Sequence, residues 1–234
     1  MSEKLSVVII SKNEEKFIAD AVKSSSFADE VLVLDSGSTD RTCAIAQEHG
    51  AKVLHQSWLG FGMQKNKAVE LANNDWVFVL DSDERITPNL QSEILGILKN
   101  PIADGYHVAR LNKFFGKNIR HCGLYPDYSI RLFNRQKGKF NNVTVHESVQ
   151  ISGDTEKLEN HMTHLAFDTI KEFSIKQKKY ATLSQKKKNL VKAFTSPIWT
   201  FIRIYVLRLG VLEGWRGLVI ATVYAQYTFW KYTK

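Results

Sequence analysis

Three carboxylates stand within four positions at the end of an apolar run. Residues 76–80 read Trp-Val-Phe-Val-Leu, and Asp81, Asp83 and Glu84 follow at once. Five successive apolar residues predict a strand buried on both faces, as in a parallel sheet. Such dense charge is costly unless a cation offsets it, and carboxylate oxygens suit Mg²⁺ or Mn²⁺. Asp81 and Asp83 are therefore candidate metal ligands. The alternative is a solvated acidic turn that caps the helix that follows, since Thr87-Pro88 is a good helix start.

Two further apolar runs end in polar clusters. Residues 5–10 lead to Ser-Lys-Asn-Glu-Glu at 11–15, and residues 31–34 lead to Asp-Ser-Gly-Ser-Thr-Asp at 35–40. Ligands bind at the carboxyl ends of strands in open α/β sheets, and parallel strands place those ends at one edge. The three clusters are therefore expected to converge on one site.

The elements that position these clusters alternate along the chain. Predicted strands at 5–10, 31–34, 52–55 and 76–80 are separated by segments with helical spacing of apolar residues. This order predicts an α/β fold with a doubly wound, mostly parallel sheet. Gly60-Phe-Gly62 lacks the third glycine of a dinucleotide fingerprint, since Lys65 stands there, and the sequence contains no P-loop. Lys65 lies in the first turn of a predicted helix, where it either meets a phosphate or is an ordinary exposed lysine.

Charge is distributed unevenly over the 234 residues. The net charge is +8, but from Lys171 onward thirteen Lys and Arg face two acids, which leaves the first 170 residues slightly acidic. A basic tail indicates an anionic partner, either nucleic acid or a membrane surface. Two cysteines suggest no disulfide framework, and no secretory signal is recognised at the start, so a cytoplasmic location is expected.

The tail from residue 169 has a helical pattern rich in lysine and aromatic residues. We expect Pro197 to interrupt it, with apolar segments at 198–209 and 218–230 that are too short to span a bilayer. Aromatic, amphipathic helices with basic flanks suit the interface of an anionic membrane. Two alternatives are packing of the aromatics against the body or another subunit, and RNA binding, for which the tail contains no recognisable module.

The chain resembles family-2 glycosyltransferases of the GT-A fold. The motifs are Ser-Lys-Asn-Glu-Glu at 11–15, Val-Leu-Asp-Ser-Gly-Ser-Thr-Asp at 33–40 and Leu-Asp-Ser-Asp-Glu at 80–84. In its second half it is similar to bacterial lipopolysaccharide inner-core β-glucosyltransferases. The residues that carry this similarity are Arg110-Leu-Asn, Phe115-Gly-Lys, Gly123-Leu-Tyr-Pro-Asp127, Ile130-Arg-Leu-Phe133, Val145-His-Glu147, His164 and the glycines 210, 214 and 217.

The resemblance implies roles in donor binding. Asp35 would bind the uracil or ribose of a nucleotide sugar, with Asn13 and Glu15 shaping that pocket. Asp81 would bind ribose or metal, and Asp83 would ligate the metal that bridges the diphosphate. Many family members carry a second acid after the second strand, where this chain has Ser36.

Inverting transfer also needs a general base for the acceptor hydroxyl. The family often supplies it in a Glu-Asp pair, which is absent here after residue 100. Glu147 and Asp127 are the candidates, and Glu147 is favoured. His146 either orients that carboxylate near the acceptor or is a satisfied core residue, and Arg131 either binds acceptor phosphate or pairs with Asp127. His164 is a candidate late metal ligand.

These observations predict a donor half at 1–100, an acceptor half at 101–168 and a helical, membrane-associating extension at 169–234. The expected reaction moves a sugar, for which glucose is favoured, from a UDP-sugar to a membrane-anchored saccharide such as lipopolysaccharide core heptose. It would use Mg²⁺ or Mn²⁺ at the inner face of the cytoplasmic membrane, without a nucleic-acid partner. The alternatives are a polyprenyl-phosphate sugar synthase and a catalytically silent membrane-surface binding protein.

Overall fold

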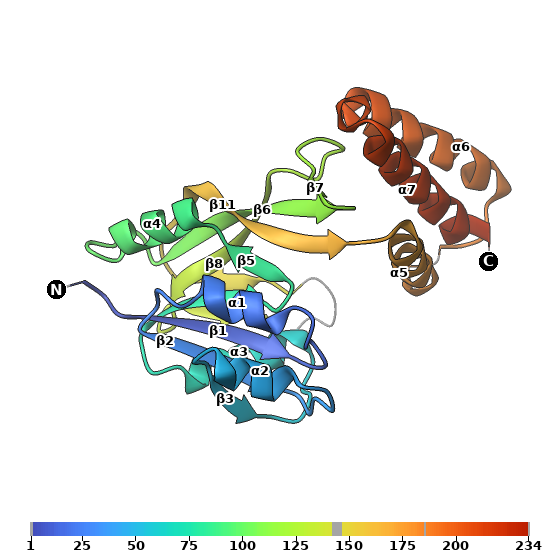
Figure 1. Cartoon of the computed structure of the whole chain (residues 1–234). Coiled ribbons are helices and arrows are strands. Elements are labelled where there is room, and N and C mark those ends of the chain that lie inside the picture. The colour runs from blue at the N-terminus through green and yellow to red at the C-terminus, as the bar shows by residue number, and fades with distance from the viewer. Residues whose placement is uncertain (1, 142–146, 185, 234) are drawn as a thin grey trace. The chain divides into compact units, whose positions relative to one another are not determined.

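Figure 1 shows the computed structural model of the chain, which describes residues 2–141, 147–184 and 186–233. The chain forms two compact units. Unit 1 contains residues 1–110 and 128–164, and unit 2 contains residues 111–127 and 165–234. Unit 2 thus includes a segment from the middle of the chain. The functional division into donor half, acceptor half and extension stays a prediction.

A parallel sheet forms the first part of unit 1. Strands β1 (Leu5–Ser11), β2 (Glu30–Asp35), β3 (Lys52–His55) and β4 (Trp76–Asp81) lie in the order β3-β2-β1-β4, and each neighbouring pair is parallel. Every residue of β1 is buried, which explains its unbroken run of apolar and small side chains. The predicted doubly wound α/β fold is confirmed.

Helices cover both faces of this sheet. They are α1 (Ile18–Ser24), α2 (Thr42–Glu48), α3 (Phe61–Leu71) and α4 (Pro88–Ile97). Helix α4 begins as expected, because the Thr87 side chain accepts a hydrogen bond from Leu90 N and Pro88 occupies the first turn. The acidic residues 81–84 therefore precede this helix but do not cap it.

Antiparallel strands extend the sheet beyond β4. The order continues β8 (Asp127–Asn134), β6 (Gly105–Phe114), β11 (Thr155–Phe167) and β5 (Glu84–Ile86). Strand β8 pairs antiparallel with β4, and β11 pairs antiparallel with β5. A separate ribbon joins β9 (Gly138–Phe140) to β10 (Val149–Ile151). These pairings bring residues near 130 and 164 beside the end of β4.

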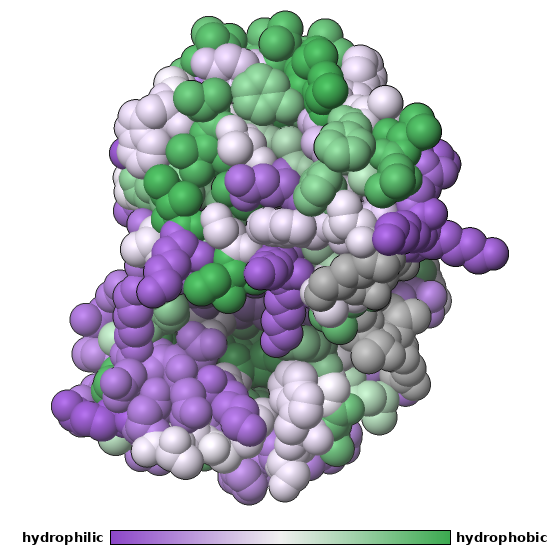
Figure 2. Space-filling model, turned by 90° about the vertical axis from the view of Figure 1, so that its right-hand side faces the viewer, coloured by the Kyte–Doolittle hydropathy of each residue, from purple (hydrophilic) through white to green (hydrophobic). Residues whose placement is uncertain are grey.

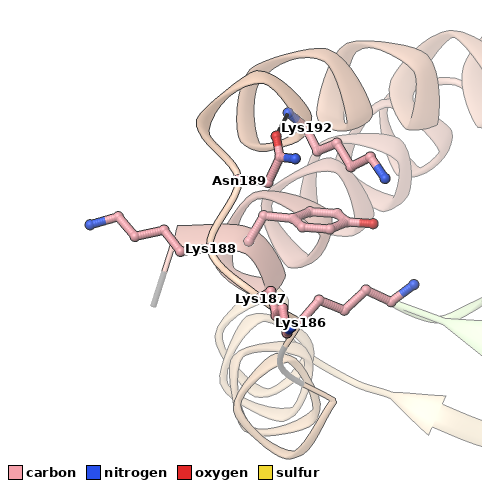
Figure 3. Close-up of a pocket in the computed structure, with 6 residues that line it drawn as sticks. Lys186, Lys187, Lys188, Asn189 and Lys192 are labelled. Carbon is pink, nitrogen blue, oxygen red and sulfur yellow. Dashed lines mark hydrogen bonds between the residues drawn. The ribbon is translucent and has the colours of Figure 1, made fainter.

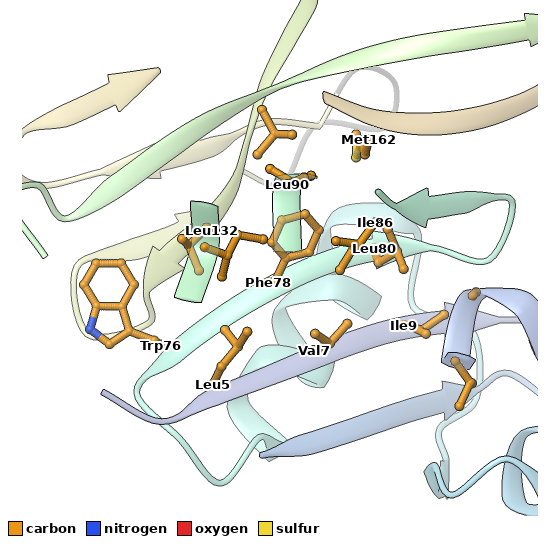
Figure 4. Close-up of a cluster of buried hydrophobic side chains, with 14 of the residues drawn as sticks. Leu5, Val7, Ile9, Trp76, Phe78, Leu80, Ile86, Leu90, Leu132 and Met162 are labelled. Atoms are coloured by element: carbon orange, nitrogen blue, oxygen red, sulfur yellow. The ribbon is translucent and has the colours of Figure 1, made fainter. Parts of the chain in front are cut away.

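Alternate residues of each buried strand feed two hydrophobic cores. Val7 and Ile9 of β1 belong to the cluster beneath α1, α2 and α4, whereas Val8 and Ile10 belong to the cluster beneath α3. Figure 4 shows the first cluster, where Phe78 and Leu80 of β4 meet Leu90 of α4 and Met162 of β11. Fully burying such a side chain contributes about 1.5–3 kcal/mol. The two cores fix β1 and β4 firmly and so define the position of their carboxyl ends.

Unit 2 is built from helices around a third core. Its elements are β7 (Lys117–Asn118), α5 (Ile170–Leu183), α6 (Leu190–Ile202), the π-helical turn η1 (Arg203–Leu207), the 3₁₀ turn η2 (Gly210–Glu213) and α7 (Trp215–Thr233). Phe173 is fully buried and makes edge-on contacts with Phe114 at 5.3 Å and Tyr224 at 5.5 Å between ring centroids. Aromatic residues of the tail therefore do pack into a core of their own unit.

The prediction that Pro197 interrupts the tail is wrong. Helix α6 begins at Leu190, where the Asn189 side chain caps it, and Pro197 lies inside the helix. An interior proline removes one helical hydrogen bond, a cost that the packing of α6 along α7 offsets. With η1, this helix forms an 18-residue run, Leu190–Leu207, that is long and apolar enough to cross a membrane by length and composition alone. The expectation that no segment reaches spanning length is corrected on that point.

Candidate active site at the strand ends

The carboxyl ends of β1, β2 and β4 lie side by side. Ser11 of β1 is in register with Asp35 of β2, and Ile10 is in register with Asp81 of β4. The two aspartates therefore flank the end of the central strand, as parallel pairing requires. We call the polar cluster at this edge the strand-end site. Its members are Asp35, Lys65, Asp81, Asp83, Glu84, Arg131, Glu147 and His164.

Asp35 organises the loop that follows its own strand. One carboxylate oxygen accepts hydrogen bonds from the backbone N–H groups of Gly37 and Ser38, both at 2.8 Å, and the other accepts from the hydroxyls of Ser38 and Ser11. Burial raises the pKa of Asp35, but these hydrogen bonds outweigh it and hold the pKa below its ordinary value. Asp35 is thus a carboxylate that shapes the loop. Its contact with a donor stays a prediction.

Asn13 and Glu15 tie the first strand-end loop to the second. The Asn13 side chain accepts a hydrogen bond from Thr39 N at 2.8 Å, and its backbone N–H donates to the Ser38 hydroxyl at 2.8 Å. Glu15 accepts from Arg41 N at 3.1 Å. Asn13 has a φ of 55°, a left-handed conformation that asparagine tolerates better than most residues. Both side chains support the rim where the nucleotide is expected.

Asp81 lies between two cations from distant parts of the chain. Its oxygens are 3.0 Å from Lys65 Nζ and 3.3 Å from Arg131 Nη1. The side chains of Lys65 and Arg131 are 6% and 8% exposed, whereas that of Asp81 is 29% exposed. Burial alone would raise the pKa of Asp81, but the two charges outweigh it and hold the pKa well below its ordinary value. Asp81 is therefore a charged, partly exposed carboxylate held by two buried cations.

Glu84 holds the other side of this arrangement and is fully buried. It accepts a hydrogen bond from Asp81 N at 3.0 Å and pairs with Arg131 Nη2 at 2.7 Å, with Arg110 Nη1 3.7 Å away. Burial raises the pKa of Glu84 above its ordinary value, although the Arg131 charge opposes the shift. The sequence showed Glu84 only as part of an acidic turn, because its partners lie some 50 and 25 positions away. Its role is to fix the Asp81 backbone and the Arg131 guanidinium.

Asp83 and His164 converge beside Asp81. The pairing of β5 with β11 sets His164 opposite Glu84, and His164 Nε2 lies 3.2 Å from Asp83 Oδ2. Among the described residues no cluster of three or more His, Cys, Asp and Glu could hold an ion. A carboxylate can nevertheless hold a divalent cation whose remaining ligands come from substrate phosphates, as is common for Mg²⁺, and His164 lies where its imidazole can add a further ligand. In this geometry the oxygens of Asp81 face Lys65 and Arg131, so Asp83 and His164 are the stronger metal candidates.

Glu147 belongs to the same site through Lys65. Its carboxylate is 3.1 Å from Lys65 Nζ, and its side chain is 17% exposed. Asp127, the second candidate base, is an exposed residue of unit 2, at the start of β8. The interpretation of His146 lies outside the described residues. Arg131 is buried against Asp81 and Glu84, so a role in acceptor binding stays a prediction.

Two further residues of this edge were not singled out from the sequence. Gln64 is fully buried and donates to the Ser36 hydroxyl at 3.0 Å and to Gln56 O at 3.1 Å, which ties the loop before α3 to the loop after β2. Glu14 faces the acidic turn, and its pKa is raised by burial and by the nearby charge of Asp83. Glu14 stands in the same motif as Asn13 and Glu15, but its position beside Asp83 depends on the sheet register.

Comparison with known proteins identifies the class. Residues 6–151 match the family model described as glycosyl transferase family 2. The chain is 32% identical to an uncharacterized glycosyltransferase of Rickettsia felis, over 99% of this chain and 89% of that protein. It is 30% identical to the lipopolysaccharide core biosynthesis glycosyltransferase LpsC of Rhizobium meliloti, over 96% of this chain and 89% of LpsC. The chain therefore belongs to glycosyltransferase family 2.

Solved structures of S. aureus TarS share the fold. S. aureus TarS 1-349, in complex with UDP-GlcNAc, matches 76% of this chain with a TM-score of 0.52 and 17% identity, and the match spans 66% of that structure. A longer TarS structure matches the same share of this chain, which spans 39% of its length. At this identity the likeness shows the GT-A type of fold alone.

Proposed function

We propose that the protein transfers a sugar, for which we favour glucose, with inversion from a UDP-sugar to a saccharide carried by a membrane lipid. The observation that carries this proposal is the strand-end site, where a supported carboxylate, Asp81, stands beside the Asp83–His164 pair at the edge where ligands bind in this fold. A ribose hydroxyl could donate to Asp81, whose side chain stays partly exposed. Membership of glycosyltransferase family 2 supports the reaction class.

Different residues of the site would bind the metal, the nucleoside and the phosphates of the donor. Asp83 and His164 would hold Mg²⁺ or Mn²⁺, which supplies positive charge to a departing nucleoside diphosphate. Asn13, Glu15 and Asp35 form the rim that we assign to the nucleoside. Lys65 is placed to donate to a phosphate oxygen as well as to Asp81 and Glu147, since its ammonium has three donors and lies at the same edge.

Glu147 is our candidate for the general base. A base must lie within hydrogen-bond reach of the acceptor hydroxyl, and its geometry must be fixed. The ion pair with Lys65 fixes the Glu147 carboxylate 3.1 Å from a buried ammonium that also contacts Asp81. This arrangement links the proposed base directly to the donor side of the site.

The acceptor class comes from the relatives and from the tail. LpsC acts in lipopolysaccharide core biosynthesis by its name, and the similarity covers nearly all of both chains. We propose core heptose on a lipid anchor as the acceptor, with the protein bound peripherally at the inner face of the cytoplasmic membrane. The basic composition of the tail agrees with an anionic membrane partner.

A donor panel tests the proposal. The purified full chain is incubated with UDP-, GDP-, CDP- and TDP-sugars, with and without Mn²⁺, and with a heptose-terminated core acceptor, and product is followed by mass spectrometry. We expect transfer from UDP-glucose that requires Mn²⁺ or Mg²⁺. We also expect Asp83→Asn to reduce transfer by about a hundredfold or more, as when one stabilising group of a transition state is removed.

Other results would contradict specific parts of the proposal. Transfer to a polyprenyl phosphate but not to the saccharide would identify a polyprenyl-phosphate sugar synthase. An absence of both transfer and slow donor hydrolysis, with every donor and metal, would indicate a silent binding protein. Equal activity of wild type and Asp83→Asn would show that Asp83 does not hold a required metal.

A further inference from the structure

Helix α6 exposes a stripe of apolar side chains. Val191, Phe194, Ile198, Ile202 and Val206 recur at helical spacing along α6 and η1, and their exposed fractions range from 40% for Ile202 to 72% for Val191. We call this stripe the α6 face. The opposite side of the same helix, with Ala193, Thr200 and Ile204, is buried. The inner side of α6 is already packed. An apolar stripe on its outer side therefore indicates a binding surface for a second apolar partner.

The apolar surface continues past the end of the helix. Further exposed side chains of the following turns and the start of α7 are Leu207, Leu209, Val211, Leu212, Trp215 and Leu218, at 45–61% exposure. In Figure 2 the upper part of the molecule, at the height of α6 and α7 in Figure 1, shows hydrophobic residues gathered over these elements. Because several consecutive elements contribute, the surface is broader than one helix side.

Four lysines border the amino end of this surface. Lys186, Lys187, Lys188 and Lys192, which we call the lysine cluster, line an open pocket of about 460 Å³ together with Asn189 and Tyr232 (Figure 3). All four are exposed, and in the described part of the chain no carboxylate forms an ion pair with them. Their mutual repulsion is relieved by an anionic partner.

The composition of unit 2 favours one kind of anionic partner. From residue 171 onward the only acids are Glu172 and Glu213, and Glu213 is buried in ion pairs with Lys117 and His121. A partner that covers this surface must therefore combine apolar material with negative charge over a wide area. The headgroup and acyl boundary of an anionic bilayer has both properties.

The geometry of α6 distinguishes docking from spanning. The helix packs along α7, while Lys192 and Arg203 stand exposed within the run of apolar residues. A spanning α6 would carry α7, which packs along it, into the hydrocarbon, whereas a helix lying in the interface leaves α7 outside and keeps Lys192 and Arg203 at headgroup level. We propose that the α6 face lies in the plane of an anionic membrane, with the lysine cluster bound to lipid headgroup phosphates.

This inference rests on the proposed function only for placing the acceptor in a membrane. It is tested without donor, by flotation of the full chain with vesicles of phosphatidylcholine alone or mixed with phosphatidylglycerol. We expect strong binding to the mixed vesicles. Phe194→Gln with Ile198→Gln should weaken binding about a hundredfold, since each buried apolar side chain contributes roughly tenfold.

A charge variant tests the second part. Lys187→Gln with Lys188→Gln should weaken binding to the mixed vesicles by about 25-fold, because each lysine near an anionic surface contributes about fivefold. Binding to pure phosphatidylcholine should not change. Matched controls are Ile102→Gln, at an exposed apolar position of unit 1, and Lys4→Gln with Lys99→Gln, also exposed and in unit 1. These controls should bind vesicles as wild type does.

Three results would overturn the inference. The first is vesicle binding by the Phe194/Ile198 variant equal to wild type, with circular dichroism showing that both proteins are folded. The second is a wild-type dimer in lipid-free solution that this variant converts to a monomer without loss of vesicle binding, which would assign the α6 face to a second copy. The third is an effect of the controls as large as that of the test variants. Loss of vesicle binding with retained transfer to a soluble acceptor fragment would separate docking from the proposed reaction.

Discussion

At the scale of residues, Asp81 owes its charged state to two cations contributed by the protein itself. The acidic cluster at 81–84 predicted a divalent metal ion as the compensating charge, and it did not predict that two side chains of the protein also supply positive charge to Asp81. Lys65 precedes Asp81 by 16 positions and Arg131 follows it by 50, so only the packing of α3 and β8 against β4 brings them together. The need for a positive charge beside Asp81 could be predicted from the local sequence. The two side chains that supply it could not.

Removing the Lys65 ammonium should weaken donor binding. In Lys65→Met, Asp81 and Glu147 lose a buried partner, so we expect at least a tenfold rise in the donor dissociation constant by isothermal titration. Each charge-assisted hydrogen bond of this kind contributes about 1.5–3 kcal/mol. Lys67→Met on the same helix is the control, because its pair with Glu70 is largely exposed and adds little. Equal donor affinity of Lys65→Met and wild type would show that Asp81 needs Arg131 alone.

Glu147 contacts Lys65 in the strand-end site, and the choice between Glu147 and Asp127 as the base stays a prediction. If Glu147 is the base, Glu147→Gln should lower kcat at least about a hundredfold while donor affinity changes little, since general bases contribute roughly 10²–10⁴-fold. Glutamine keeps an oxygen that can accept from Lys65. Asp127→Asn should retain turnover within a few-fold. A Glu147→Gln enzyme with near wild-type kcat would reduce Glu147 to a residue that positions Lys65.

At the scale of elements, strands and helices of the first hundred residues could be predicted because the signal is local. Buried strands such as β1 are runs of apolar residues, and Thr87-Pro88 marks the start of α4. The helices of the tail, from residue 169 onward, were harder to predict. The lysine-rich stretch before Asn189 gave no signal that one helix ends and another begins there, between α5 and α6. Pro197 suggested the end of a helix, but α6 continues through it and packs along α7.

A close approach between η2 and α7 gives a test of this packing. A Cβ on Gly217 would lie 1.8 Å from Gly210 O, which is backbone and cannot move aside cheaply. Gly217→Ala should therefore destabilise the protein by roughly 2–3 kcal/mol, the range of overpacked cores, and lower the Tm in calorimetry. Gly96→Ala in α4 is the control, because nothing lies within 4 Å of its Cβ. That change should stabilise by up to about 1 kcal/mol. A Gly217→Ala protein as stable as Gly96→Ala would show that η2 and the first turn of α7 can move apart at little cost in free energy.

Glu213 joins η2 to the segment around β7 and makes unit 2 sensitive to acid. Burial raises its pKa, but hydrogen bonds from His121, Lys117 and the backbone of Arg120 outweigh this and lower the pKa from 4.5 to about 2. A carboxyl with a lowered native pKa stabilises the fold above its unfolded value, and this contribution is lost as the pH falls through the native pKa. Wild type should exceed Glu213→Gln in unfolding free energy by roughly 2–3 kcal/mol at neutral pH.

The test compares the unfolding free energies of wild type and Glu213→Gln at each pH. The difference isolates Glu213, because the other carboxyls titrate in both proteins. Urea unfolding of wild type and Glu213→Gln should give a gap that is constant above about pH 5 and closes between pH 4.5 and about pH 2. A gap that stays constant to low pH would mean that the glutamine loses packing and not charge. Glu172→Gln, in the exposed capping box of α5, is the control and should show a smaller difference.

At the scale of the whole molecule, the parallel part of the sheet could be predicted from the sequence, whereas the antiparallel part could not. Strand β4 continues to β8, β6, β11 and β5, an order that interleaves segments from residues 84 to 167. Such pairing has no local sequence signal, since each strand meets partners that lie far along the chain. The same long-range pairing placed His164 beside Asp83, whereas the family resemblance suggested both as metal ligands without showing how they meet.

Metal-dependent donor binding should be visible in the stability of the whole chain. A ligand that binds only the native state, at a hundred times its dissociation constant, adds about 2.7 kcal/mol of stability. For UDP with Mn²⁺ we expect a rise in the Tm of the transition that includes unit 1, by roughly 5–10 °C at the sensitivity usual for chains of this length. Chelation with EDTA should remove most of the rise, because the diphosphate and the Asp83–His164 pair would then lack their shared cation. His164→Ala should show the smaller, EDTA-insensitive shift even with Mn²⁺ present. A shift that is equal in wild type and His164→Ala, or unaffected by EDTA, would place the metal elsewhere or show that the nucleotide binds without one.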